Sequence, residues 1–482
     1  MQILAAMGQI MDLNHWLVIA MFLTFIVMLF RGIPVVYSLV GVGLIFSLLA
    51  IFVLDPNKNL INEYIHFKRT GISYKKLFAT AGRFFGSTIE NPVLVALPMF
   101  IYMGLMLDQS GVAQTMMRSM QKLFGALRGG LALTVMLIGI ILAASTGVIG
   151  ASVVLLGVMG IPTMMKQGYA KPIATGTIAA SGTLGILIPP SIMLVIMSDQ
   201  LAISLGDLFM GALFPGLLLG ALYILYIVVY GFIKPEAMPL PRDREPISWR
   251  AVLDVLKSVV PPFGLVLLVL GSIFFGIATP TEASGLGALG ATFLALASRN
   301  LTFKVFKDVM RQTLNTGGYI VGIFIAANFF SFILRRFNGD DIIEGLVLGT
   351  FDNPYYVVGF ILFIIFLLGF LLDWIEITLI IMPLMLPVIE GLGIPVNGFG
   401  QVENPSVVWF AILVAVTLQT SFLTPPVGFA LFYLKGVCPP NINLGHIYRG
   451  IIPFVILQIL GLLIVFFWPE MVTWLPAVAF AR

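Results

Sequence analysis

Charged residues are scarce in this chain of 482 amino acids. Asp, Glu, Lys and Arg make up 10% of the sequence and hydrophobic residues make up 59%, whereas soluble domains carry roughly 25% charged residues. This composition is typical of a polytopic all-α membrane protein. The net charge of +4 is small, so we expect no nucleic-acid partner.

Cysteine and histidine are also nearly absent. The single cysteine, Cys438, excludes a disulfide framework within the chain and a cysteine-based metal cluster. The phosphate-binding signature G-x-x-x-x-G-K-[S/T] does not occur, which argues against ATP hydrolysis by that route. An intramembrane serine protease would need a serine paired with a histidine, and neither His15 nor His446 lies in an interrupted apolar segment. We therefore expect that the protein is not an enzyme.

What the chain has in abundance is long apolar runs. A membrane-spanning helix needs about 20 apolar residues, and eleven runs reach or approach this length. They are Trp16–Phe30, Ile33–Leu54, Val93–Leu107, Ile173–Met197, Leu208–Ile233, Val259–Ala278, Ala283–Ala297, Gly317–Leu334, Tyr355–Leu372, Trp409–Tyr433 and Ile451–Trp468.

Two apolar stretches are broken by short polar segments. Residues 131–165 contain Ala144-Ser145-Thr146-Gly147, and residues 355–391 contain Asp373-Trp374-Ile375-Glu376. The first arm of the first stretch has about 14 residues, which as a helix is roughly 21 Å long. Because the hydrocarbon core is roughly 30 Å thick, the first stretch is predicted to form a re-entrant hairpin rather than two spans. The second stretch has longer arms, and its similar interruption also predicts a hairpin.

Two further spans contain a pair of prolines. Pro189-Pro190 and Pro425-Pro426 stand inside apolar runs beside serine, threonine and glycine. Proline removes a backbone donor and clashes with the preceding turn, so each span is predicted to be a broken helix. Such backbone is tolerated at membrane depth only where it is buried in protein or lines a watery cavity.

The predicted elements recur in the same order in two halves of the chain. Residues 15–233 and 258–470 each contain three spans, a hairpin, a broken span and a final span. Basic residues predict that the loops at 234–257 and 299–311 are cytoplasmic. Counting back through the spans places the N-terminus outside and gives the halves opposite orientations. Paired broken helices in such an inverted repeat indicate a midplane binding site and alternating access.

One segment disagrees with this count. Residues 55–91 would lie outside, although they are basic. We expect a partly interfacial amphipathic segment there, near 74–87.

Candidate binding residues gather at the four interruptions. The set is Ser145, Thr146, Gly147, Ser152, Ser181, Gly182, Thr183, Gly185, Pro189, Pro190, Asp373, Glu376, Thr378, Thr417, Thr420, Ser421, Thr424, Pro425 and Pro426. Hydroxyl and unwound carbonyl oxygens suit Na⁺, while amides at the following helix N-termini suit an anion. The alternative is that the small residues only allow close packing of membrane helices.

The carboxylates of Asp373 and Glu376 need a separate explanation. A carboxylate near the bilayer centre costs roughly 2.5–3.5 kcal/mol, so it is usually functional or paired. The alternative is a hairpin tip that lies in water.

Three other polar groups have simpler explanations. Thr279-Pro280-Thr281-Glu282 is predicted to be a turn followed by a helix cap. Two charged groups are predicted to be solvated faces, with partner docking or contact with lipid headgroups as the alternative. One group consists of Arg118, Lys122 and Arg128, and the other consists of Arg335, Arg336, Asp340, Asp341 and Glu344.

The motifs together resemble a known family. Residues 179–191, 276–283 and 424–428 resemble the large membrane subunit of tripartite ATP-independent periplasmic (TRAP) transporters. The resemblance implies a sodium-gradient-driven secondary transporter that imports a small organic anion across a bacterial inner membrane. It also implies two partners, namely a small membrane subunit and a periplasmic binding protein that delivers the substrate. The implied fold has two hairpins and two broken helices in a moving elevator domain. The hairpin tips would be Ser145–Ser152 and Asp373–Thr378, and the helices would be broken at Ser181–Ser191 and Thr417–Gly428.

The resemblance also implies site residues and a division of the chain. One sodium site is expected beside each hairpin, with Ser145, Gly147, Thr183, Asp373, Thr420 and Thr424 as ligands. Residues 131–205 and 353–437 would form the transport domain, while 1–130, 206–352 and 438–482 would form the scaffold. The substrate cannot be predicted, because selectivity in this family rests largely with the binding protein. The alternatives are a stand-alone sodium-coupled anion carrier and an anion channel.

Overall fold

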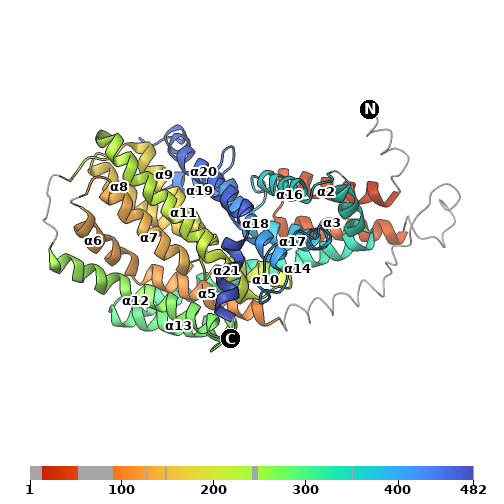
Figure 1. Ribbon diagram of the computed structural model, residues 1–482, viewed down its shortest axis with the longest axis horizontal. Helices are drawn as coiled ribbons and strands as arrows, with labels where there is room; N and C mark the ends of the chain where they lie inside the picture. Colours follow the sequence, from red (N-terminus) through yellow and green to blue (C-terminus); the bar gives the residue numbers. More distant parts are fainter. Residues whose placement is uncertain are drawn as a thin grey trace. The chain divides into compact units, whose positions relative to one another are not determined.

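The computed structural model describes residues 13–52, 91–125, 127–146, 149–241, 248–349 and 351–480. These residues form helices joined by turns, and no strand occurs among them, which confirms the all-α prediction. Figure 1 shows the helices in chain order. The basic segment at 55–90 and its predicted amphipathic stretch lie outside the described residues.

The order of the helices follows the two predicted halves. The first half contains α2 (Leu13–Phe30), α3 (Val35–Phe52), α5 (Pro92–Gln109), α6 (Val112–Phe124), α7 (Gly130–Thr146), α8 (Ile149–Lys166), α9 (Lys171–Thr183), η1 (Leu184–Ile186), α10 (Ile192–Gln200) and α11 (Leu205–Ile233). The second half contains η2 (Pro235–Ala237), α12 (Trp249–Phe274), α13 (Pro280–Ala297), α14 (Phe303–Arg336), α15 (Gly339–Leu348), α16 (Pro354–Leu368), α17 (Trp374–Gly391), α18 (Pro405–Leu423), α19 (Phe429–Val437), α20 (Leu444–Phe467) and α21 (Glu470–Phe480).

Seven of the described helices are long and apolar enough to cross a membrane, and an eighth span results if α5 and α6 count together. The bend between α5 and α6 is 53°. Helix α6 is amphipathic, since it buries Met116, Met117 and Met120 while Arg118 and Lys122 are exposed. This pattern agrees with the predicted solvated face of Arg118 and Lys122.

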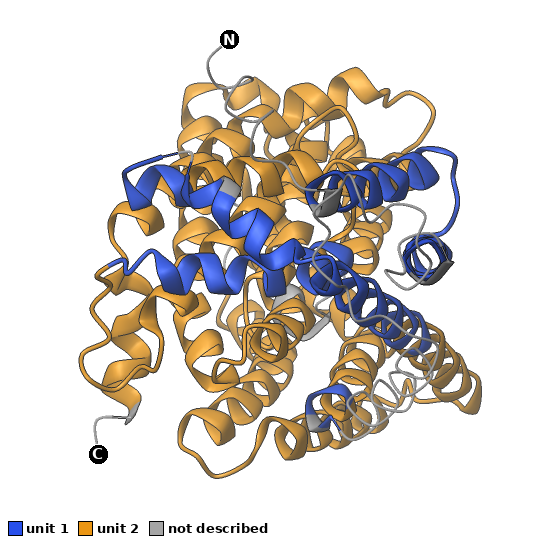
Figure 2. Ribbon diagram, turned by 90° about the vertical axis from the view of Figure 1, so that its right-hand side faces the viewer, with its two compact units in different colours: residues 1–94, 318–358, 375–394 blue, residues 95–317, 359–374, 395–482 orange. Residues whose placement is uncertain are grey.

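The chain forms two compact units, coloured separately in Figure 2. Unit 1 comprises residues 1–94, 318–358 and 375–394. Its described part contains α2, α3, the second half of α14, α15 and most of α17. Aromatic side chains hold it together, because Phe22 and Phe25 both pack against Phe330 with ring centroids 5.8 and 5.6 Å apart.

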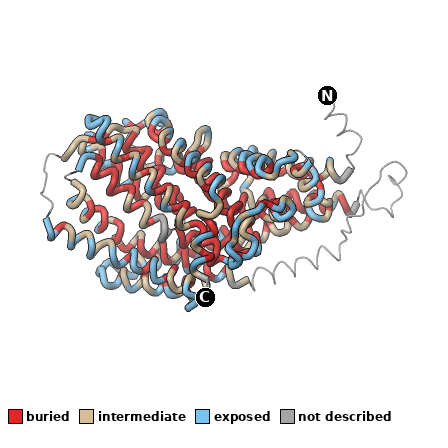
Figure 3. The backbone as a smooth tube through the Cα atoms, in the orientation of Figure 1, coloured by how far each residue is buried: buried red, intermediate tan, exposed pale blue. Residues whose placement is uncertain are grey.

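Unit 2 comprises residues 95–317, 359–374 and 395–482. Helix α9 lies at its centre, in contact with α7, α8, α19 and α20. Helix α18 contacts α9, α11, α20 and α21, and both α9 and α18 are buried over most of their length (Figure 3). The bounds of the predicted scaffold and transport domain differ from those of the two units. The division into scaffold and transport domain stays a prediction.

Three local predictions can be compared directly with the structure. A capping box joins Thr279 and Glu282 at the start of α13, which confirms the predicted helix cap. Arg335 and Asp340 form an ion pair at 3.1 Å with side chains 52% and 30% exposed, in agreement with a solvated face. The last span was predicted to end at Trp468, but the chain continues into helix α21, which adds 11 residues of apolar helix.

Candidate functional site

The first predicted hairpin and the first broken helix pack closely against each other within unit 2. Helices α7 and α8 contact one another, and both contact α9. Glycines allow this approach: a Cβ added at Gly139 of α7 would overlap the Cβ of Ser181, and one added at Gly182 would lie 3.1 Å from the Cα of Val153 on α8. The sequence pattern therefore brings these distant segments together through side chains of minimal size.

The first break lies closer to the prolines than predicted. Helix α9 continues to Thr183, a 3₁₀ turn covers 184–186, and residues 187–191 with the cis Pro189–Pro190 bond separate it from α10. Ser181, Gly182 and Thr183 are therefore helical, and Gly185 lies in the 3₁₀ turn, so the expected unwinding from Ser181 was wrong. The reason is that proline excludes helical backbone mainly at the residue before it.

Polar groups in this first break are buried and satisfied locally. The hydroxyls of Ser181 and Thr183 donate to the carbonyls of Ile178 at 3.1 Å and Ala180 at 3.0 Å. Ser191 donates to the carbonyl of Ile186 at 2.7 Å, which satisfies an acceptor that the interrupted helix leaves free. Each hydroxyl oxygen keeps lone pairs that can accept a hydrogen bond or a cation.

The second break follows the same plan with a more open surface. Helix α18 ends at Leu423, Thr424 is extended, and the cis Pro425–Pro426 bond precedes α19. The Thr424 hydroxyl donates to the carbonyl of Thr420 at 2.7 Å. Pro426 is exposed and Thr424 is half-buried, whereas every residue from Ser181 to Ser198 is buried. Access from outside is thus greater at the second break.

Thr417, Thr420 and Ser421 lie in regular α-helix, so the prediction that the second break begins at Thr417 was wrong. The hydroxyls of Thr417 and Thr420 each donate to the carbonyl four residues earlier, at 2.8 Å. Both residues line a groove of about 340 Å³ whose other walls are glycine and apolar side chains of α16 and α20. These surroundings suit side chains that pack between helices.

The predicted tip of the first hairpin lies only partly within the described residues. Ser145 and Thr146 form the end of α7, with side chains outside the described set, and Gly147 lies outside the described residues. Ser152 is buried in the first turns of α8.

The turn between α16 and α17 precedes most of the second predicted tip. Helix α16 ends at Leu368 and α17 begins at Trp374, so Trp374–Thr378 are helical rather than a tip. Asp373 accepts a hydrogen bond from the Trp374 backbone N–H at 2.8 Å, and aspartate is a preferred residue directly before a helix. The polar residues at 373–376 thus mark the start of α17, which explains why the turn lies before most of the predicted tip.

The two carboxylates near this tip have different surroundings. Glu376 is 1% exposed in unit 1, and its Oε1 accepts a hydrogen bond from the Tyr319 hydroxyl at 3.3 Å. Thr378 is buried in the same unit. Asp373 belongs to unit 2 and is half-buried. Neither carboxylate is freely solvated, which disfavours the expectation of a tip in open water.

Tyr433 is a candidate site residue that the sequence analysis missed. It lies on α19, and its ring contacts the Gly150 position just after the first tip, where a Cβ would be 3.1 Å from the ring. The Asp373 carboxylate of the second tip lies within electrostatic range of the Tyr433 hydroxyl. One aromatic side chain therefore lies near both hairpin ends. No sequence signal separates it from the other aromatic residues of the run.

A buried polar cluster was missed as well. Tyr223 of α11, Gln419 of α18 and Gln458 of α20 are fully buried, and both amides lie next to the tyrosine hydroxyl. None of these polar groups reaches a described partner in favourable hydrogen-bond geometry. The neighbouring ring of Phe454 lies 5.3 Å from that of Tyr223. Each residue stands alone in an apolar run, so only the fold reveals the cluster.

Comparison with known proteins decides the family. Residues 22–471 match the family model of the tripartite ATP-independent periplasmic transporter, DctM component. The chain belongs to this TRAP transporter family. It is therefore a multi-pass membrane protein and a transporter large permease rather than an enzyme.

Named members of the TRAP family match 79% to 93% of the chain. The C4-dicarboxylate TRAP transporter large permease DctM of Vibrio cholerae is 30% identical over 423 residues, which cover 83% of this chain and 89% of that protein. The sialic acid TRAP transporter large permease SiaM of the same species is 26% identical over 452 residues, 93% of this chain and 96% of that protein. The 2,3-diketo-L-gulonate permease YiaN of Escherichia coli is 24% identical over 384 residues, 79% and 85% of the two chains.

Solved structures support the fold of this TRAP permease. The Alcanivorax borkumensis YdaH transporter is similar with a TM-score of 0.61 and 13% identity, covering 89% of this chain and 98% of that one. Neisseria gonorrhoeae MtrF is similar with a TM-score of 0.55 and 12% identity, covering 89% and 94%. At these identities the likeness concerns the fold alone.

Proposed function

We propose that this TRAP permease is the subunit through which a sodium gradient drives import of a small organic anion. The anion, a carboxylate or sugar acid, is delivered by a periplasmic binding protein, and a small membrane subunit completes the system in a bacterial inner membrane. The observation that carries the proposal is the pair of broken helices, because α18 contacts α9, η1 and α10 inside unit 2. C4-dicarboxylate, sialic acid and 2,3-diketo-L-gulonate, which name three relatives, all carry carboxylates.

The ends of the broken helices offer groups that suit an anion. Ser191 and Gly428 precede α10 and α19, and neither provides a side-chain cap for the first turn. Uncapped N–H groups and the helix dipole favour a negative charge at such an N-terminus. We assign the substrate carboxylate to this region, with Tyr433 as a neighbouring polar group.

Sodium would be bound by neutral oxygen atoms and a single carboxylate. Among the described residues no group of three or more His, Cys, Asp or Glu could hold a metal ion, and hydroxyl and carbonyl oxygens are the remaining hard ligands. We propose Ser145, Gly147 and Thr183 for one site and Asp373, Thr420 and Thr424 for the other. The apolar groove around Thr420 makes it the weakest member of this set.

The proposed movement is that of an elevator. Two re-entrant hairpins, α7–α8 and α16–α17, would carry the broken helices across a fixed scaffold, with the N-terminus on the periplasmic side. Alternating access in inverted repeats is largely a rigid-body movement of this kind.

The first test is uptake into vesicles that contain the purified permease and its small subunit. Saturable uptake of the labelled anion is expected only with an inward sodium gradient and the binding protein present. Uptake that continues without the binding protein would favour the stand-alone carrier. Single-channel currents without saturation would favour the anion channel.

The second test concerns the hydroxyls at the breaks. Thr183→Ala and Thr424→Ala are each expected to raise the sodium concentration for half-maximal uptake about tenfold, which corresponds to about 1.4 kcal/mol of lost binding. Thr134→Ala is the matched control, because the Thr134 side chain in α7 is as buried as that of Thr183 and its hydroxyl donates to the carbonyl of Gly130 at 2.8 Å. Wild-type sodium dependence in both break variants would contradict the assignment.

A further inference from the structure

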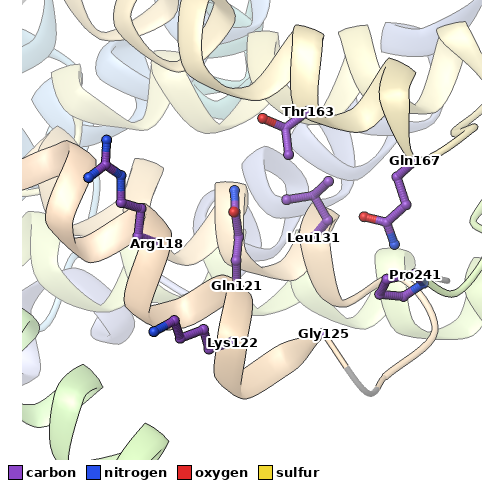
Figure 4. Close-up of a pocket in the computed structure, with 8 residues that line it drawn as sticks. All are labelled: Arg118, Gln121, Lys122, Gly125, Leu131, Thr163, Gln167 and Pro241. Atoms are coloured by element: carbon purple, nitrogen blue, oxygen red, sulfur yellow. The ribbon is translucent and has the colours of Figure 1, made fainter. Parts of the chain in front are cut away.

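A cavity of about 430 Å³ lies where α6 ends, α7 begins and α8 ends (Figure 4). In this view Arg118 and Gln121 rise from α6 toward Thr163 on α8, and Gln167 faces the same space from the end of α8. The described residues that line it are Arg118, Gln121, Lys122, Gly125, Leu131, Thr163, Gln167 and Pro241.

The charge of this cavity is unbalanced. Arg118 and Lys122 are exposed and lie one turn apart on α6, a helix whose sequence has no acidic residue. Among the described lining residues none is acidic, and neither cation forms an ion pair with a described residue. Two positive charges therefore face a cavity in which no described anion compensates them.

The donors in the cavity fit a phosphate group. The planar guanidinium of arginine matches phosphate oxygens in a two-point contact, and lysine adds a compact positive charge. Thr163 donates its hydroxyl hydrogen to the carbonyl of Met159 and Gln167 donates to the carbonyl of Pro239, so both donors are already engaged. The remaining donors are Arg118, Lys122 and the Gln121 amide.

The helix ends at the cavity also affect the binding of an anion. Both helices end at the cavity, and the partial negative charge of a helix C-terminus disfavours an anion there. The N-terminus of α7 lies at the same cavity and favours an anion, so the backbone contributions oppose one another and the two cationic side chains would decide binding.

The cavity is separate from the proposed transport site. Leu131 stands at the start of α7 and Thr146 at its end, which places the cavity about 20 Å along the helix from the hairpin tip. Helix α6 has a buried methionine face and a basic exposed face, a pattern typical of helices that lie at a membrane surface.

We propose that this cavity binds a phosphate group through Arg118 and Lys122. The group is supplied either by the headgroup of an anionic phospholipid or by free inorganic phosphate. Such a ligand would join α6 to the start of α7 and the end of α8. The proposal does not depend on sodium coupling or on the transported substrate.

The experiment measures ligand-dependent thermal stability of the purified full-length permease in detergent. One arm adds phosphatidylglycerol, with phosphatidylcholine as the neutral lipid. The other arm adds sodium phosphate, with sodium chloride at equal ionic strength. Arg118→Gln combined with Lys122→Gln is compared with Lys304→Gln combined with Lys307→Gln, because Lys304 and Lys307 are exposed on α14 and also carry two positive charges.

The wild type is expected to be stabilised by at least one phosphate ligand, and the dissociation constant of that ligand is expected to rise at least tenfold in the Arg118/Lys122 variant alone. Stabilisation only by phosphatidylglycerol identifies a lipid headgroup, and stabilisation only by sodium phosphate identifies a free ion. The proposal is overturned if neither ligand stabilises the wild type, or if both double variants lose binding equally.

Discussion

Replacement of Gly176 with alanine is expected to destabilise the permease by about 3 kcal/mol, at the upper end of the range for overpacked cores. A Cβ at this position would overlap the carbonyl oxygen of Gly450 on α20 and lie 2.5 Å from its carbonyl carbon. These are backbone atoms, so the crossing of α9 and α20 must widen to admit the methyl group. A decrease of about 3 °C in the thermal unfolding midpoint of the detergent-purified protein would show this effect.

The same crossing supplies a reciprocal test and a control. A Cβ at Gly450 would overlap the carbonyl oxygen of Pro172 on α9, so Gly450→Ala is expected to behave like Gly176→Ala. Gly285 of α13 has no heavy atom within 4 Å of an added Cβ, and alanine there improves helix propensity. Gly285→Ala should therefore leave the midpoint unchanged or raise it. Equal midpoints in all three variants would mean that α9 and α20 are not in close contact.

The order of helices could be predicted because it depends on local composition. Apolar runs mark the spans, and Pro189-Pro190 and Pro425-Pro426 mark the broken ones, since a helix interior tolerates neither the missing donor nor the clash. The bounds of the breaks were less predictable. Serine and threonine in an apolar run occur both in unwound backbone and in helices where they donate to a preceding carbonyl. Thr417 and Thr420 proved to be of the second kind.

The contacts between helices that are distant in the chain could not be predicted from the sequence. Gly176 and Gly450 are far apart in the chain, and no periodicity links them. Tyr223, Gln419 and Gln458 come from three helices and form a cluster only in the folded protein. Tyr433 acquires its position near both tips in the same way. The sequence thus identified the segments of the site, while packing selects which side chains face one another.

Gly139→Ala is expected to reduce uptake more than tenfold, and a second change in Ser181 can show why. The added methyl group would overlap the Cβ of Ser181 and lie 2.9 Å from its Oγ, which forces α7 and α9 apart beside the first break. Combining it with Ser181→Gly removes the overlap, and the nearest remaining atom is Cδ1 of Leu156 at 3.3 Å. The thermal midpoint of the double variant is therefore expected to recover toward that of the wild type.

Transport by the Gly139→Ala/Ser181→Gly double variant shows whether Ser181 only packs between helices or also binds an ion. Its hydroxyl donates to the carbonyl of Ile178, and that local bond is compatible with packing alone or with a lone pair directed at an ion. If Ser181 only packs, Gly139→Ala with Ser181→Gly regains both stability and sodium-dependent uptake. We expect stability to return while the sodium requirement rises about tenfold, because Ser181 is a candidate binding residue two positions before the proposed ligand Thr183, and packing cannot replace its hydroxyl oxygen there. Uptake assays over a range of sodium concentrations, with Ser181→Gly alone as the control, decide between these outcomes. A double variant with wild-type sodium dependence would assign Ser181 to helix packing and leave Thr183 as the hydroxyl of the first break.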